Sequence, residues 1–183
     1  VMLAREMDEI PEVIGYAVAT EEEAVLLADA GIKKPAMVLG YTFSEAYEEM
    51  ALRGVHATVF TDQMLEDMNR AAQKAGKKMH VHIAVDTGMG RIGYSDDVTS
   101  VEDVKMIAGL SNFKINGLFS HFATADAADK TYATVQEQRY MSFYKQLLKE
   151  GIDIPLRTLG NSAAVMEINS AYYDMVRPGV ILY

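Results

Sequence analysis

VHIAVDTGMGRIG, the stretch from Val81 to Gly93, begins as an apolar, partly β-branched run and ends as a glycine-rich loop that carries one arginine, Arg91. The apolar half is typical of a strand that is buried on both faces. The loop follows at the carboxyl end of that strand, where α/β proteins place their binding and catalytic side chains. The stretch therefore predicts an α/β fold with a site close to Arg91.

Similar apolar runs recur along the chain, and longer amphipathic segments separate them. Strands are expected at residues 13–19, 36–40, 57–61, 79–85, 114–121, 156–160 and 175–183. Repeated β/α units imply parallel strands joined by right-handed crossovers, either in an open doubly wound sheet or in a closed (β/α)8 barrel. Because the strands follow a leading helical segment, we expect an incomplete (β/α)8 TIM-type barrel whose first strand is missing from this chain.

Capping residues and glycines mark where the helices begin and end. Thr20 and Glu23 form the pattern of a capping box, and Gly31 follows as a stop signal. We expect Asp62 to cap a helix over residues 63–75. Further helices are expected over residues 1–10, 44–53, 99–109, 134–149 and 163–168.

The composition excludes several classes of protein. The chain has 183 residues, of which half are hydrophobic, and a formal net charge of −9. Such an acidic chain is a poor nucleic-acid scaffold, although local arginines can still hold a small anion. It contains no cysteine, which excludes disulfides and thiolate metal sites. No apolar run approaches the roughly 18 residues of a membrane span, and no signal peptide is visible, so a cytoplasmic location is expected.

Gly88, Gly90 and Gly93 form a G-x-G-x-x-G pattern, which raises the question of a dinucleotide site. That site would need a helix that opens at the third glycine and an acid at the end of the next strand. After Gly93 the chain continues YSDDVTS, which is a loop, and the next strand offers no such acid. We therefore interpret the glycines as residues that let the backbone turn sharply beside Arg91. The alternative, a tight loop with a solvated Arg91, stays open.

Polar residues follow the other expected strands as well. They occur in SHFATAD (120–126), GNSAA (160–164) and RPGV (177–180). The carboxyl ends of parallel strands converge on one face of a barrel, so these segments would meet the Arg91 loop there. The last two strand ends are where such barrels often hold a phosphate, through backbone N–H groups and a hydroxyl.

Each of these segments also has a purely structural interpretation. His121 could be a satisfied structural histidine, residues 161–162 could only cap a helix, and residues 177–179 could only form a turn. His80 and His82 share one strand face with no cluster of carboxylates, so we expect no metal site. Two arginines, one histidine and a phosphate cradle suit a phosphorylated aromatic cofactor better than a metal ion.

Together these motifs resemble a known family. VDTGMGRIG (85–93), SHFATAD (120–126), GNSAA (160–164) and VRPGVILY (176–183) look, in this order and spacing, like the pyridoxal-phosphate barrel of bacterial alanine racemases. GYAVATEEEAVLLADAGI (15–32) and VLGY (38–41) match the second and third strands of that barrel. The resemblance implies that residues 1–183 are part of the N-terminal barrel of an isomerase that interconverts L- and D-alanine with pyridoxal 5'-phosphate.

The resemblance implies cofactor-binding roles for the last strand ends. Arg177 would face the pyridine nitrogen and keep it unprotonated, because an arginine is always charged. The ring would then be a weaker electron sink, which favours racemisation over side reactions. Ser162 and the backbone of Gly179 and Val180 would hold the phosphate, and Asn161 would support the same pocket.

Arg91 would reach the phenolic oxygen of the cofactor and the carboxylate of the substrate, and His121 would lend support near Arg177. Two positions depart from the family. Ala84 stands where many members have a lysine, usually carbamylated, that supports the arginine matching Arg91. Thr158 stands where a histidine commonly bonds the pyridine-facing arginine, although a hydroxyl can still accept from Arg177. These departures leave the preferred substrate, alanine or serine, open.

The same resemblance implies that none of the family's catalytic residues lies within this chain. The cofactor-binding lysine would precede Val1, and the opposing tyrosine would lie in a C-terminal β-domain after Tyr183, so the fragment alone is expected to be inactive. Family members are homodimers that supply D-alanine for peptidoglycan, with a small amino acid as substrate and no nucleic acid or membrane as partner. A serine-preferring relative, a non-catalytic pyridoxal-phosphate carrier, and a phosphate-binding barrel enzyme of another reaction type stay open as alternatives.

Overall fold

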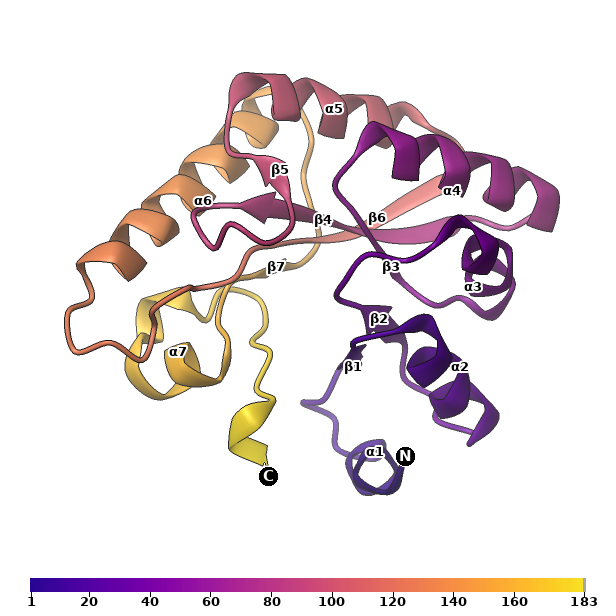
Figure 1. Cartoon of the computed structure of the whole chain (residues 1–183), viewed down its shortest axis with the longest axis horizontal. Coiled ribbons are helices and arrows are strands. Elements are labelled where there is room, and N and C mark those ends of the chain that lie inside the picture. Colours follow the sequence, from indigo (N-terminus) through magenta and orange to yellow (C-terminus); the bar gives the residue numbers. More distant parts are fainter. Residues whose placement is uncertain (183) are drawn as a thin grey trace. The chain divides into compact units, whose positions relative to one another are not determined.

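The computed structural model describes residues 1–182, which fall into two compact units. Unit 1 comprises residues 1–81 and 111–114, and unit 2 comprises residues 82–110 and 115–183. In both units helices alternate with strands, and the strand pairs β1–β2, β4–β5 and β6–β7 are all parallel (Figure 1). The expected α/β class is confirmed, and parallel strands that alternate with helices make up a partial TIM barrel.

Unit 1 holds the N-terminal helices and the first short strands. Its elements are α1 (Met2–Met7), β1 (Tyr16–Val18), α2 (Glu21–Asp29), β2 (Ala36–Val38), the 3-10 turn η1 (Ser44–Ala46), α3 (Tyr47–Arg53), β3 (Ala57–Val59) and α4 (Asp62–Ala75). β1 pairs with β2, with Tyr16 opposite Ala36, and a parallel bridge joins Met37 to His56. Every residue of β2 and β3 is buried, as the continuous apolar runs predict.

The helix caps of unit 1 follow the sequence signals with two differences. Thr20 Oγ1 accepts the N–H of Glu23 at 3.4 Å, while the Glu23 carboxylate accepts the N–H of Ala19 rather than that of Thr20, at 2.8 Å. Thr61, not Asp62, is the N-cap of α4, because its side chain accepts an N–H of the first turn. Asp62 is instead the first helical residue, where its negative charge suits the positive end of the helix dipole.

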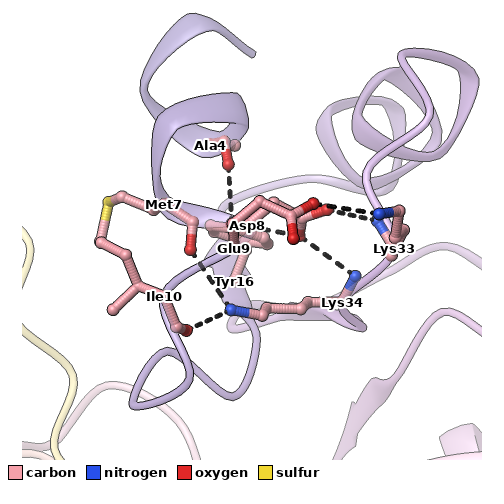
Figure 2. Close-up of polar contacts among 8 residues, drawn as sticks. All are labelled: Ala4, Met7, Asp8, Glu9, Ile10, Tyr16, Lys33 and Lys34. Carbon is pink, nitrogen blue, oxygen red and sulfur yellow. Dashed lines mark hydrogen bonds and ion pairs between the residues drawn. The ribbon is translucent and has the colours of Figure 1, made fainter.

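Asp8 fastens the end of α1 to the segment before β2 (Figure 2). Its carboxylate accepts the backbone N–H of Lys33 at 2.9 Å and that of Lys34 at 3.3 Å. The Tyr16 hydroxyl lies within donor distance of both Asp8 (3.4 Å) and the carbonyl oxygen of Ala4 (2.8 Å). The Lys33 N–H is the main reason that the pKa of Asp8 is lowered. α1 is therefore held to unit 1 by polar contacts from its last turn.

Unit 2 carries the longer strands and the end of the chain. Its elements are β4 (Met79–Asp86) and β6 (Phe113–Phe119), which both begin in unit 1, then β5 (Tyr94–Ser95), α5 (Val98–Gly109), α6 (Thr131–Lys149), β7 (Arg157–Thr158), α7 (Ser162–Glu167) and the 3-10 turns η2 (Asn169–Ala171) and η3 (Val180–Leu182). The hydrogen-bonded strand order is β3-β4-β6-β7, and β5 pairs with β4. β4 is buried along nearly its whole length, as expected for a central strand.

Two expectations for unit 2 are wrong. No strand forms over residues 175–182. The Arg177 N–H bonds to the carbonyl oxygen of Gly160, and Pro178 has no N–H for hydrogen bonds to a neighbouring strand. Tyr183, the last residue of the expected strand, lies outside the described residues. The segment after Gly93, expected to be irregular, forms β5. In addition, α5 and α6 begin slightly earlier than their sequence signals suggest.

Candidate functional site

The candidate site lies in unit 2, at the carboxyl ends of β4 and β6. A cavity there is lined by the end of β4, the glycine loop that follows it, and the end of β6. The lining residues are Ala84, Val85, Asp86, Met89, Arg91, Ile92, Phe119, Ser120 and His121. The structure thus brings together Ala84, Arg91 and His121, three of the residues that the sequence singled out.

Arg177 is bound to the carboxyl ends of β6 and β7. Its Nη1 donates to Thr158 Oγ1 at 2.7 Å, and its Nη2 donates to the carbonyl oxygen of Ser120 at 2.6 Å. The guanidinium carbon lies 5.2 Å from the centroid of the Phe119 ring. A guanidinium has five N–H donors, and both of these acceptors are neutral. Thr158 therefore fixes the orientation of Arg177 without neutralising its charge.

Ser162 and Gly179 are in direct contact, because the Gly179 N–H donates to Ser162 Oγ at 2.9 Å. Asn161 caps α7 through its Oδ1, and its Nδ2 lies 3.3 Å from Nε2 of His121. Asn161 therefore caps a helix and also contacts a site residue. Val180 is 82% exposed and begins η3, so its side chain is turned toward solvent.

Positive φ angles and one carboxylate shape the glycine loop. Asp86 Oδ1 accepts the N–H of Gly88 at 2.8 Å and that of Gly90 at 3.0 Å. At Gly93, φ is +128° and an added Cβ would lie 2.4 Å from the backbone nitrogen of Asp86, so a side chain cannot be accommodated. No helix opens at Gly93, since α5 begins only at Val98. The loop is therefore not a dinucleotide fingerprint.

Two arginines bring positive charge to the site, where Asp86 also lines the cavity. Burial, together with the charge of Arg91, lowers the pKa of Arg177 to about 10, so Arg177 stays charged at neutral pH. Burial, followed by the charges of Arg177 and Arg91, lowers the pKa of His121 to about 4. The imidazole is therefore neutral near pH 7, and two cations remain to attract an anionic ligand.

We expect His121 to make the protein less stable in mild acid. The folded-state pKa of about 4 lies below the ordinary value of 6.5, so the unfolded chain takes up this proton first as the pH falls. The stability that neutral His121 contributes is complete above about pH 6.5 and is lost as the pH falls toward 4. The measurement is an NMR titration of the histidine rings together with thermal melts between pH 7 and pH 4.

His121→Asn is the variant that isolates this effect, because an amide keeps a polar group without titrating. It should remove one low-pH titration curve and reduce the slope of Tm against pH. His56 keeps part of the slope, since its pKa is also lowered to about 4, mainly by burial. A His121 ring that titrates near pH 6.5 would contradict the assigned environment.

Sequence reasoning missed a buried polar network behind the site. Thr87 Oγ1 and Ser120 Oγ lie 2.9 Å apart, and Gln136 of α6 reaches both the Thr87 hydroxyl and the carbonyl oxygen of His121. Tyr140 links two strands, because it donates to the carbonyl oxygen of Leu118 and accepts the N–H of Thr158. One signal was available: Gln136 is a polar residue on the otherwise apolar buried face of α6.

The other histidines are buried or stacked within the two units. His80 stacks on His56 in unit 1, with ring centroids 4.9 Å apart, and His82 is 3% exposed on β4. Within residues 1–182, no group of three or more histidine, cysteine, aspartate or glutamate side chains could hold a metal ion. No helix in the described part of the chain is both long and apolar enough to cross a membrane.

The fold and the site define a partial (β/α)8 domain with a pocket at its strand ends that is lined by Arg91 and lies beside the contacts of Arg177. Comparison with known proteins makes the assignment more specific. The family described as "Alanine racemase, N-terminal domain" matches residues 3–183, and the chain belongs to this family.

Individual relatives agree with that assignment. The alanine racemase of Methanococcus maripaludis is 42% identical over 167 residues, which are 91% of this chain and 45% of the relative. The alanine racemase of Clostridium novyi is 41% identical over 182 residues, which are 97% of this chain and 47% of the relative. The chain therefore spans about half the length of the relatives that it matches.

A solved structure shows the same fold. The alanine racemase of Clostridium difficile 630, in complex with cycloserine, superposes with a TM-score of 0.96 and 34% sequence identity. The superposition covers 100% of this chain and 50% of that one. This agreement confirms the predicted barrel class.

Proposed function

We propose that this chain is the cofactor-binding barrel part of a pyridoxal-phosphate-dependent amino-acid racemase that acts on alanine. The observation that carries the proposal is the joint placement in unit 2 of Arg177, Arg91 and the Ser162–Gly179 contact. Membership of the alanine racemase family supports it. By the same resemblance, a C-terminal β-domain would lie outside residues 1–183, and the whole enzyme would be a cytoplasmic homodimer that supplies D-alanine for peptidoglycan.

The residues present fit a phosphorylated pyridine. The Gly179 N–H donates to Ser162 Oγ at 2.9 Å, so the two groups lie together, and the Ser162 hydroxyl would donate its own hydrogen to a phosphate oxygen. The Gly179 N–H would serve the same phosphate by exchanging Ser162 Oγ for a phosphate oxygen. Arg177 is oriented by Thr158 and Ser120 and still has unused N–H donors for a ring nitrogen. Asn161 and His121 would support this pocket, and the Val180 N–H would serve as a further phosphate donor. When bound, the cofactor would withdraw electrons from the α-carbon of the amino acid.

The chain's own residues would bind and orient rather than transfer protons. Arg91 would hold the substrate carboxylate and the phenolic oxygen of the cofactor, because it is the arginine that lines the cavity at the end of β4. Arg177 would keep a permanent positive charge opposite the ring nitrogen, so no proton settles there. The lysine and tyrosine that move protons on the two faces of the α-carbon would come from outside residues 1–183, so this part alone would be inactive.

The direct test uses the full-length protein. It is incubated with pyridoxal phosphate, its absorbance spectrum is recorded, and the optical rotation of L-alanine is followed, with L-serine in a parallel reaction. A protein-bound cofactor band and loss of optical activity with L-alanine support the proposal. Faster loss with L-serine would make the enzyme a serine racemase. A cofactor band without racemisation would indicate a non-catalytic carrier, and no band would reject the cofactor assignment.

Ser162→Ala should weaken cofactor binding by about five- to tenfold. The change removes one hydroxyl from the phosphate contacts, and one hydrogen bond is worth about 1 kcal/mol. The measurement is a titration of the apoprotein with pyridoxal phosphate, followed by absorbance. Ser170→Ala is the matched control, because Ser170 is exposed in η2 and bonds to Glu137 instead. Equal affinity in the two variants would remove Ser162 from the phosphate site.

A further inference from the structure

Three polar side chains on one face of α6 form hydrogen bonds to the start of the glycine loop. Tyr132, Gln136 and Arg139 are spaced by four and three residues, so they lie one above another along the helix. The Tyr132 hydroxyl donates to the carbonyl oxygen of Gly88 at 2.8 Å. Arg139 Nη1 donates to the carbonyl oxygen of Thr87 at 3.4 Å. The helix thus holds the backbone at the start of the loop that carries Arg91.

Gln136 is the centre of this arrangement. Its Nε2 donates to the carbonyl oxygen of His121 at 3.0 Å and lies 3.4 Å from Thr87 Oγ1, and its Oε1 accepts the N–H of Ala123 at 2.9 Å. Gln136 is fully buried. A single side chain therefore joins the loop after β4 to the loop after β6, and all of its polar atoms are used in doing so.

Arg91 has no comparable support of its own. It is an exposed residue, and Ala84, which lines the same cavity, has no polar side-chain atom to offer it. Its position therefore depends on the backbone of the loop. Asp86 accepts the N–H groups of Gly88 and Gly90. Side chains of α6 donate to the carbonyl oxygens of Thr87 and Gly88.

We propose that α6 is a clamp that sets the position of Arg91, with Gln136 as its central positioning residue. The assignment of Arg91 to the substrate carboxylate rests on the proposed function; the clamp itself rests on the contacts of α6. Removing the Gln136 amide leaves the carbonyl oxygen of His121 and the N–H of Ala123 without this partner, while the Thr87 hydroxyl keeps its contact with Ser120 Oγ. The two strand-end loops would then separate from the helix, and Arg91 would lose its fixed distance from the site.

The test compares Gln136→Leu with Gln138→Leu in the full-length protein. Leucine keeps the side-chain volume and removes every hydrogen bond, and Gln138 is an exposed glutamine on the same helix. With Gln136→Leu, we expect amide hydrogen exchange over residues 87–91 to rise about tenfold. Exchange over residues 16–38 of unit 1 should stay at the wild-type rate. With the amino-acid substrate, KM should rise about tenfold while kcat changes little, because ground-state holding of the substrate is lost.

Two results would overturn the clamp. One is exchange over residues 87–91 that matches the Gln138→Leu control. The other is a rise of similar size across the whole chain, which would make Gln136 a general stabilising residue. If Gln136→Leu does not fold, Tyr132→Phe takes its place in the exchange experiment. This variant removes only a hydroxyl from a half-exposed ring. It must still raise hydrogen exchange over residues 87–91 if α6 holds the loop. If the wild-type protein binds no pyridoxal phosphate, the proposed function is wrong. The hydrogen-exchange result does not depend on the cofactor and would still test the positioning role of Gln136.

Discussion

Arg177→Ala is expected to alter the absorbance spectrum of protein-bound pyridoxal phosphate and to lower the rate of racemisation by about 10- to 100-fold. A hydrogen bond to a charged group contributes about 1.5–3 kcal/mol, which corresponds to that range. The variant removes the cation proposed to face the pyridine nitrogen. It also leaves Thr158 Oγ1 and the carbonyl oxygen of Ser120 without their donor, and the Phe119 ring without the guanidinium above it. Absorbance and optical rotation of L-alanine measure the two effects.

Arg70→Ala is the matched control for this experiment. Arg70 is an exposed arginine of α4 that pairs with Asp67 three residues earlier, and surface pairs of this kind contribute little. The control should keep the wild-type spectrum and rate. An unchanged spectrum in Arg177→Ala, with cofactor still bound, would mean that no pyridine nitrogen faces Arg177. The site would then belong to a phosphate-binding barrel enzyme of another reaction type.

Gly93→Ala is expected to destabilise the protein by about 3 kcal/mol or more and to lower the yield of folded protein. A backbone conformation that only glycine adopts easily costs about 1–3 kcal/mol for another residue. At Gly93 the φ angle of +128° adds to a direct overlap, because the new Cβ would lie 2.4 Å from the nitrogen of Asp86 and 2.7 Å from the carbonyl carbon of Val85. These backbone atoms belong to buried β4 and cannot move aside. Thermal and urea melts of the full-length protein provide the measurement.

Gly90→Ala separates the cost of the positive φ angle from the cost of the overlap with β4, within the same loop. Gly90 also has a positive φ, +68°, but nothing lies within 4 Å of an added Cβ. Only the conformational cost remains there, about 1 kcal/mol. Equal melting temperatures for the two variants would show that the loop moves away from β4 to admit a side chain at Gly93.

Most of the expected strands form close to their expected limits. β2, β3, β4, β6 and β7 each begin and end within two residues of the expected range. The buried β2, β3 and β4 are continuous apolar runs, which leave few alternatives. The strand expected over residues 175–183 is absent from the described part, since Pro178 and the Arg177 N–H are used elsewhere. β5 could not be foreseen, because two residues have no periodicity to detect.

The candidate site divides in the same way. Arg91 and His121 could be placed from the strand ends alone, because parallel strands bring their carboxyl ends together. Arg177 was expected within a strand that does not form, but it still bonds to Thr158 and to the carbonyl oxygen of Ser120. The resemblance also predicted that the Thr158 hydroxyl accepts from Arg177, and the structure has this contact at 2.7 Å. The contact of Gln136 with the carbonyl oxygen of His121 was not predicted, because it depends on tertiary packing that no local pattern encodes. A glutamine on an apolar helix face was the single visible sign.

The pairing of β5 with β4 also limits how this site can vary. Val85 lies opposite Tyr94 and Asp86 opposite Ser95. Residues 87–93 therefore connect β4 to β5, which pairs with β4 in a fixed register. One inserted or deleted residue would shift that register and turn Tyr94, which is 6% exposed, away from the interior. Side chains of the residues other than glycine in this loop can be exchanged, but the length of the loop cannot change. The fold therefore fixes the distance between the Arg91 backbone and the end of β4. A different ligand must be accommodated by other residues of the cavity.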